Sequence, residues 1–107
     1  MALSAEDIAF AHDLFSGLGP LTTRRMFGGV AFYCDGTIFA LMRSDGDILI
    51  KGAGDFIARL EGAGAERWTY SRKDGKSAAM PYWSLPGHAL DDPEEACALA
   101  RDALRYL

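Results

Sequence analysis

The segment RRMFGGVAFYCDGTIFAL, residues 24–41, decides the fold of this 107-residue chain. At its centre, Asp35-Gly36 has the residue types that occupy both positive-φ positions of a type I′ turn. Apolar, β-branched and aromatic residues lie on both sides, as in the two strands that such a turn connects. Because the same dipeptide recurs at Asp45-Gly46 and Asp74-Gly75 between strand-like runs, the sequence predicts a sheet of antiparallel hairpins.

The remaining sequence supplies helices and a second hairpin. Ser4 is placed to cap a helix that continues to Gly19, and Asp92 to cap a last helix. A short helix is expected over residues 55–61. Strands are expected over residues 26–33, 37–43, 47–51, 67–72 and 76–83. The prediction is one two-layer α+β domain over residues 1–107, in the order α-β-β-β-α-β-β-α, with an antiparallel sheet of about five strands.

Turn geometry also predicts which side chains share a face of the sheet. If Cys34 opposes Thr37 and Ser44 opposes Asp47, one face collects large apolar residues. These residues are Val30, Phe32, Phe39, Leu41, Ile48 and Ile50. We expect the helices to cover this face. In the second hairpin, Pro81 lacks the amide that a central strand needs, so it marks an edge or a bulge.

The opposite face is also predicted to be apolar or small. Its residues are Ala31, Tyr33, Ile38, Ala40, Met42 and Leu49. An antiparallel sheet face in water would alternate to polar residues, so this face also needs a cover. We expect a homodimer in which the same face of a second copy provides it. The alternative is a helix of the same chain folded over this face.

Composition and charge exclude several classes of protein. Half of the residues are hydrophobic and 24% are charged, as in a globular chain, and no apolar run approaches the roughly 20 residues of a membrane span. The N-terminus lacks the basic and apolar regions of a signal peptide, and Cys34 and Cys97 have no C-x-x-C spacing, so we expect free thiols and a cytoplasmic location. The net charge of −4 predicts weak or absent binding to duplex DNA.

The glycine pairs and histidines do not match the patterns of phosphate, metal or catalytic sites. Gly28-Gly29 precedes a strand and not a helix, which favours a kink or close packing over a phosphate loop. Gly52-Ala53-Gly54 is followed by Asp55, whose charge would repel a phosphate, so a plain turn is favoured. His12 and His88 have no partner at ligand spacing, so a solvated or capping role is favoured.

The remaining reactive side chains have ordinary explanations as well. Asp35 next to Cys34 is expected to raise the pKa of that thiol, which argues against an activated nucleophile. The carboxylates at 91, 92, 94 and 95 are explained by helix capping and the helix dipole better than by a cation site. The sequence therefore predicts no catalytic residue, no metal ligand and no cofactor.

A small basic group offers an alternative function. Arg72, Lys73 and Lys76 lie at the tip of the second hairpin, close in sequence to Trp68 and Tyr70. This mixture of cationic and aromatic side chains can hold a single strand of nucleic acid. Such charges also protect edge strands from pairing with other chains, so both interpretations remain open.

One resemblance adds to this interpretation. The motif Met26-Phe27-Gly28-Gly29 resembles the one that opens the first strand in the N-terminal domain of the TfoX/Sxy competence regulators. The similarity continues through Asp35-Gly36, Met80-Pro81-Tyr82-Trp83 and Asp91-Asp92, nearly the whole chain. It implies an α+β domain, often dimeric, from proteins linked to control of transformation genes, without catalytic residues. We therefore expect a non-enzymatic regulatory domain that contacts an unidentified protein; the alternative is a single-stranded nucleic-acid-binding module.

Overall fold

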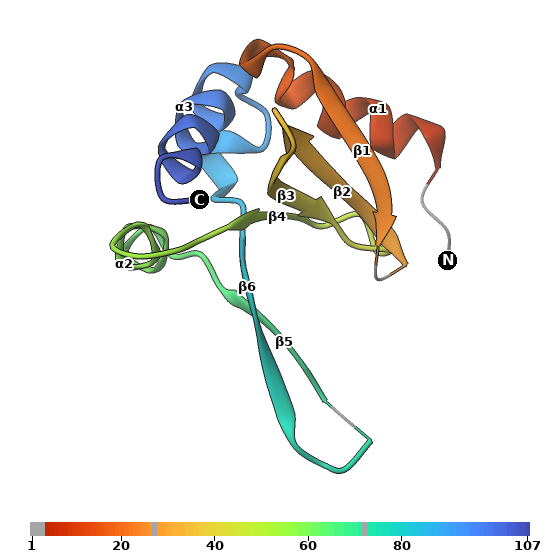
Figure 1. Cartoon of the computed structure of the whole chain (residues 1–107), viewed down its shortest axis with the longest axis vertical. Helices are drawn as coiled ribbons and strands as arrows, with labels where there is room; N and C mark the ends of the chain where they lie inside the picture. The colour runs from red at the N-terminus through yellow and green to blue at the C-terminus, as the bar shows by residue number, and fades with distance from the viewer. Residues whose placement is uncertain (1–3, 27, 72) are drawn as a thin grey trace.

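The computed structural model of the chain describes residues 4–26, 28–71 and 73–107, leaving out the side chains of residues 70 and 71. An antiparallel sheet has helices packed against it, and a long hairpin extends away from the helices (Figure 1). The helices are α1 (Ala5–Leu14), α2 (Phe56–Gly62) and α3 (Pro93–Leu104), with short 3-10 turns at Ser16–Leu18 and Gly87–Ala89. The strands are β1 (Leu21–Met26), β2 (Gly29–Cys34), β3 (Thr37–Met42), β4 (Ile48–Lys51), β5 (Arg67–Ser71) and β6 (Ser77–Ser84). This is the α+β fold that the sequence predicts, with one strand more.

β1 is the additional strand. Across the described residues the strand order is β1-β2-β3-β4-β6-β5, and β1 pairs with β2 from Leu21↔Cys34 to Met26↔Gly29. Four of its six residues are exposed, so β1 shows no apolar alternation by which a strand can be recognised. The expectation that Met26 opens the first strand is wrong, because Met26 ends β1 and the chain reverses before Gly29.

Side chains at the two outer helices form the predicted N-caps. The Ser4 hydroxyl accepts the Asp7 amide at 3.1 Å and the Asp7 carboxylate accepts the Ser4 amide at 3.2 Å, a capping box. The Asp92 carboxylate accepts the amides of residues 94 and 95, with Pro93 in the first turn. The first helix ends at Leu14 and not near Gly19, because the Ser16 hydroxyl bonds the Asp13 carbonyl and a 3-10 turn follows.

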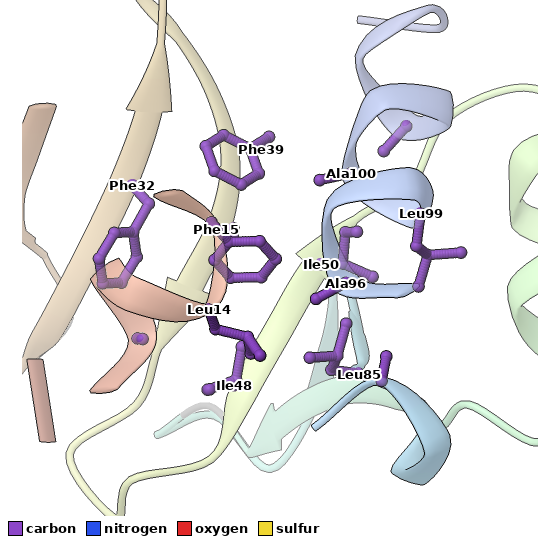
Figure 2. Packing of buried hydrophobic residues seen from close by; sticks show 14 of the residues in the cluster. Leu14, Phe15, Phe32, Phe39, Ile48, Ile50, Leu85, Ala96, Leu99 and Ala100 are labelled. Atoms are coloured by element: carbon purple, nitrogen blue, oxygen red, sulfur yellow. The ribbon is translucent and has the colours of Figure 1, made fainter. Parts of the chain in front are cut away.

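The core lies between one face of the sheet and the helices. Phe15, just after α1, packs edge-on against Phe39 of β3 with ring centroids 5.2 Å apart, and against Phe32 of β2 at 6.4 Å. Figure 2 shows these rings opposite the α3 residues Ala96 and Ala100. All five are fully buried. We call this side of the sheet the helix-covered face, and it confirms the expectation that helices cover one face.

The hairpin between β3 and β4 has a different register from the predicted one. The Arg43 amide donates to the Asp47 carbonyl at 2.9 Å, and the Gly46 amide donates to the Arg43 carbonyl at 2.9 Å. Gly46 has φ +91°, as in a three-residue loop that closes with a left-handed glycine. Ser44 therefore does not oppose Asp47, and this prediction is wrong by one residue. At the first hairpin, by contrast, Asp35 and Gly36 both have positive φ and Cys34 opposes Thr37, as predicted.

A β-bulge in β3 changes the predicted faces of three residues. Phe32 opposes Ala40 whereas Tyr33 opposes Ile38, so Phe39 is an extra residue in the β3 side of the ladder. Beyond it the alternation is shifted, and Ala40 and Met42 belong to the core cluster with Phe39. Leu41 lies instead in the cluster on the opposite face. The predicted faces of Ala40, Met42 and Leu41 are therefore wrong. The other nine residues lie on the predicted faces: Val30, Phe32, Phe39, Ile48 and Ile50 toward the helices, and Ala31, Tyr33, Ile38 and Leu49 on the opposite side.

The hairpin formed by β5 and β6 extends beyond the rest of the sheet (Figure 1). β4 pairs with β6 only through residues 82–84, so the outer part of β6 has β5 as its strand partner. The β5–β6 register shifts between Arg67↔Trp83 and Thr69↔Ala79, which leaves two additional residues in β6. Pro81 lies within this irregularity, so of the two predicted alternatives, an edge or a bulge, the structure shows a bulge.

Candidate interaction surface

The face of the sheet opposite the helices carries a second apolar cluster. Its buried members are Ala31, Leu41, Leu49 and Tyr82, and the partly buried side chains around them are Met26, Tyr33, Ile38, Trp68 and Met80. We call this side the helix-free face. Of the six residues predicted for it, the structure brings together Ala31, Tyr33, Ile38 and Leu49. The bulge brings Leu41 into this cluster, and the β5–β6 hairpin adds Trp68, Met80 and Tyr82.

Side chains of the sheet and of the loop after β3 close this face. The guanidinium of Arg24 on β1 lies over the Tyr33 ring at 5.8 Å, and that of Arg43 lies over the Trp68 ring at 5.9 Å. Trp68 also contacts Tyr82, with ring centroids 6.5 Å apart. These side chains leave the small and aliphatic residues beneath them almost without water contact. Arginine stems can cover apolar surface in this way, and here the Nε atom of Arg43 is itself buried without a hydrogen-bond partner among the described residues.

Electrostatics on the helix-free face follow from this packing. Burial raises the pKa of the Tyr82 phenol, and the neighbouring Tyr33 raises it further. Arg43 forms ion pairs with Asp47 and, at 3.3 Å, with Asp45. The face therefore presents aromatic and thioether side chains together with arginines, a composition typical of interfaces between proteins.

The glycines of the Met-Phe-Gly-Gly motif shape the β1–β2 turn. Gly28 has φ +76°, a conformation that favours glycine. A Cβ on Gly29 would stand 1.9 Å from the carbonyl oxygen of Met42, so the β2 and β3 backbones meet closely there. Met26 contributes to the helix-free face, and Phe27 lies outside the described residues. The predicted close packing is thus found at Gly29, whereas Gly28 lies in a turn between two strands and not in a kinked strand.

The tip of the β5–β6 hairpin carries exposed positive charge. Lys73 and Lys76 are exposed, and the Lys76 amide donates to the Asp74 carboxylate at 3.0 Å. Arg72 and the side chain of Tyr70 lie outside the described residues. Trp68 packs between Arg43 and Tyr82, so its ring is part of the helix-free face and not of the hairpin tip.

The cysteines and histidines are not brought together. Burial raises the pKa of the Cys34 thiol and the Asp35 carboxylate raises it further, in the direction predicted. Cys97 is buried and its thiol donates to the Leu14 carbonyl at 3.5 Å. His12 is exposed, and His88 lies 4.0 Å from the Glu95 carboxylate. In the described ranges, no group of three or more His, Cys, Asp and Glu side chains could hold a metal ion.

These observations define a class of protein: a small α+β domain with helices on one face of an antiparallel sheet and an aromatic, helix-free second face. Residues 13–107 match the TfoX N-terminal domain, and the chain belongs to this family. It is similar to "DNA transformation protein TfoX1" of Aliivibrio fischeri (strain ATCC 700601 / ES114), with 38% identity over 87 residues. The match covers 81% of this chain and 41% of that relative, so the chain spans well under half of the relative's length.

Among the described residues, no helix is long and apolar enough to cross a bilayer.

Proposed function

We propose that the chain is a non-enzymatic regulatory domain that acts by contact with another protein in the control of natural transformation. Membership of the TfoX N-terminal domain family supports the regulatory class. A relative with "DNA transformation protein" in its name supports the link to transformation. The two free cysteines support a cytoplasmic site of action.

The observation that carries this proposal is the helix-free face. The helices and the larger core lie on the other face of the sheet, and the helix-free face holds a second apolar cluster. Tyr33, Ile38, Trp68 and Met80 are only partly buried there, so their remaining apolar surface is available to a partner. We propose that this face pairs with the same face of a second copy, since a twofold interface lets one patch serve both subunits.

Affinity purification of the full chain from its native cell, read by mass spectrometry, tests the contact with another protein. Ile38→Glu places a charge on the helix-free face, and Thr23→Glu places one on an exposed site of the other face of β1. Because a second copy covers this face, we expect a partner that binds the paired form: the wild-type chain and Thr23→Glu retain it, and Ile38→Glu loses it. Recovery of the same proteins by all three chains would contradict this use of the face.

Absence of catalysis is a separate part of the proposal. A broad hydrolase and transferase screen is expected to give no turnover. Activity that disappears when one polar residue is replaced would overturn it. Binding to duplex DNA is likewise expected to be undetectable at sub-micromolar protein and physiological salt, because acidic residues outnumber basic ones by fifteen to eleven.

A single-stranded nucleic-acid-binding module is the second candidate function. The observation that favours it is the position of Lys73 and Lys76 at the tip of a hairpin that extends away from an otherwise acidic chain (Figure 1). It predicts retention on single-stranded DNA that weakens steeply with salt and is lost in the double variant Lys73→Ala, Lys76→Ala. Equal retention of the variant would eliminate this candidate.

A further inference from the structure

Two exposed apolar side chains lie at one hollow in the helix layer. Phe10 on α1 is 51% exposed and Leu90, which precedes α3, is 38% exposed. Both line a hollow of about 120 Å³ together with Pro93. Among the described residues the other exposed large hydrophobic side chain is Tyr106, and its ring stacks on Phe56. Of the large hydrophobic side chains that are exposed in the described ranges, the hollow thus gathers the two that are not stacked on another ring.

The dimensions of this hollow fit a side chain better than a metabolite. Pockets for small molecules hold about 300–1,000 Å³, whereas this one has the volume of one apolar side chain. At Pro93 it adjoins an open hollow of about 440 Å³, lined also by Gly17, Glu94 and Arg101. The two hollows share Pro93 and lie side by side along the α1–α3 junction. We call them together the groove; this arrangement suits a peptide that inserts one side chain and continues along the helices.

The charge around the apolar hollow is negative. Asp13 and Asp91 line it, and Glu94 lines the adjoining hollow. In the part of the chain that the structure describes, none of these three carboxylates forms an ion pair. The cation of the groove, Arg101, lies in the adjoining hollow, where its guanidinium donates to the Gly17 carbonyl at 3.0 Å. A partner segment with positive charge is therefore complementary to the rim.

We propose that the groove between α1 and α3 binds a basic peptide segment of a partner protein. One Leu-, Met- or Phe-type side chain of that segment fills the hollow beside Phe10 and Leu90, and Lys or Arg side chains flank it opposite Asp13 and Asp91. A buried apolar anchor supplies most of the affinity, and the charged rim supplies selectivity and salt dependence. The groove lies in the helix layer, on the other side of the sheet from the helix-free face, so this inference does not depend on the dimer.

The test uses the full chain and an mRNA-display library of random 12-residue peptides selected at physiological salt. We expect the enriched peptides to combine one large apolar residue with neighbouring Lys or Arg. Their affinity, measured by fluorescence polarisation, should fall at least about tenfold for Phe10→Ser. The double variant Asp13→Asn, Asp91→Asn keeps the shape of the groove and should weaken binding several-fold, with a shallower dependence on salt.

Lys73→Ala, at the distant hairpin tip, is the matched control and should bind with unchanged affinity. Circular dichroism shows whether each variant is folded. If Phe10→Ser does not fold, the Asn double variant still tests the proposal. Failure to enrich any peptide, enrichment without an excess of Lys and Arg, or equal affinity for the wild-type chain and the Asn double variant would overturn the proposal.

Discussion

The two faces of the sheet are both apolar, but they are closed in different ways. On the helix-covered face, whole elements pack onto the strands, and Phe15 meets Phe32 and Phe39 beneath α3. On the helix-free face, Arg24 of β1 lies over the Tyr33 ring, and Arg43, which follows β3, lies over the Trp68 ring. The comparison shows that burial in one chain does not by itself mean cover by a helix. A face closed by its own side chains can still offer apolar surface to a partner.

The largest expected effect comes from a charge placed on the helix-covered face. Ala40 is fully buried there, so Ala40→Glu introduces an unpaired carboxylate into the core. The cost is about 5 kcal/mol or more, because an uncompensated charge and overpacking combine. We expect loss of the cooperative thermal transition by circular dichroism. If the Ala40→Glu chain folds normally, Ala40 lies on the helix-free face, and the bulge at Phe39 is wrong.

The next effect tests how strongly the aromatic core is packed. Phe39 is fully buried and contacts Phe15 edge-on, so Phe39→Ala should lower the free energy of unfolding by about 3–5 kcal/mol. Chemical denaturation measures the loss. The control is Lys73→Ala at the exposed tip, for which we expect a change of no more than about 0.5 kcal/mol. A loss below about 1 kcal/mol for Phe39→Ala would show that the Phe39 side chain does not lie in the core.

Two adjacent glycines, Gly28 in the β1–β2 turn and Gly29 at the start of β2, give a pair of predictions with smaller losses of stability. Gly29→Ala forces the β2 and β3 backbones apart, because the new Cβ would meet the Met42 carbonyl, and should cost about 2–3 kcal/mol. At Gly28 the nearest atom to a new Cβ is 3.9 Å away. The positive φ alone then makes Gly28→Ala cost about 1 kcal/mol. Equal losses in urea denaturation would contradict this division of roles.

A small effect measures how closed the helix-free face is. Since burial and Tyr33 raise the pKa of the Tyr82 phenol above its ordinary value of 10.0, Tyr82 should keep its proton beyond that pH. The unfolded chain releases this proton earlier, so the stability associated with it is present below pH 10 and declines as pH rises through the folded-state pKa. In an absorbance titration at alkaline pH, Tyr82→Phe should remove the latest phase. If Tyr82→Phe instead removed a phase at about pH 10 and kept the latest one, Tyr82 would be open to water.

Much of the helix-covered side could be predicted because its signals are local. Ser4 and Asp92 are recognisable as N-caps, and Asp35-Gly36 sets the first turn. The bulge at Phe39 could not be predicted, since one extra residue in a ladder changes the facing without altering local composition. β1 lies at the edge of the sheet and most of its residues are exposed, so its sequence has no apolar alternation by which a strand can be recognised.

The helix-free face was predicted only in part. Its members on β2, β3 and β4 follow from alternation along neighbouring strands, apart from the shift at Leu41. Trp68 and Tyr82 belong to a hairpin that returns to β4 after α2, so their place depends on long-range pairing that no short sequence pattern specifies. The groove beside Phe10 likewise requires α1 and α3, which are distant in the sequence.

Light scattering coupled to size exclusion, at micromolar protein, tests most directly the claim that the helix-free face joins two copies. We predict a mass twice 11.6 kDa for the wild-type chain and for Thr23→Glu, and a mass near 11.6 kDa for a folded Ile38→Glu chain. A wild-type mass near 11.6 kDa, or an Ile38→Glu chain that keeps the doubled mass, would contradict the account.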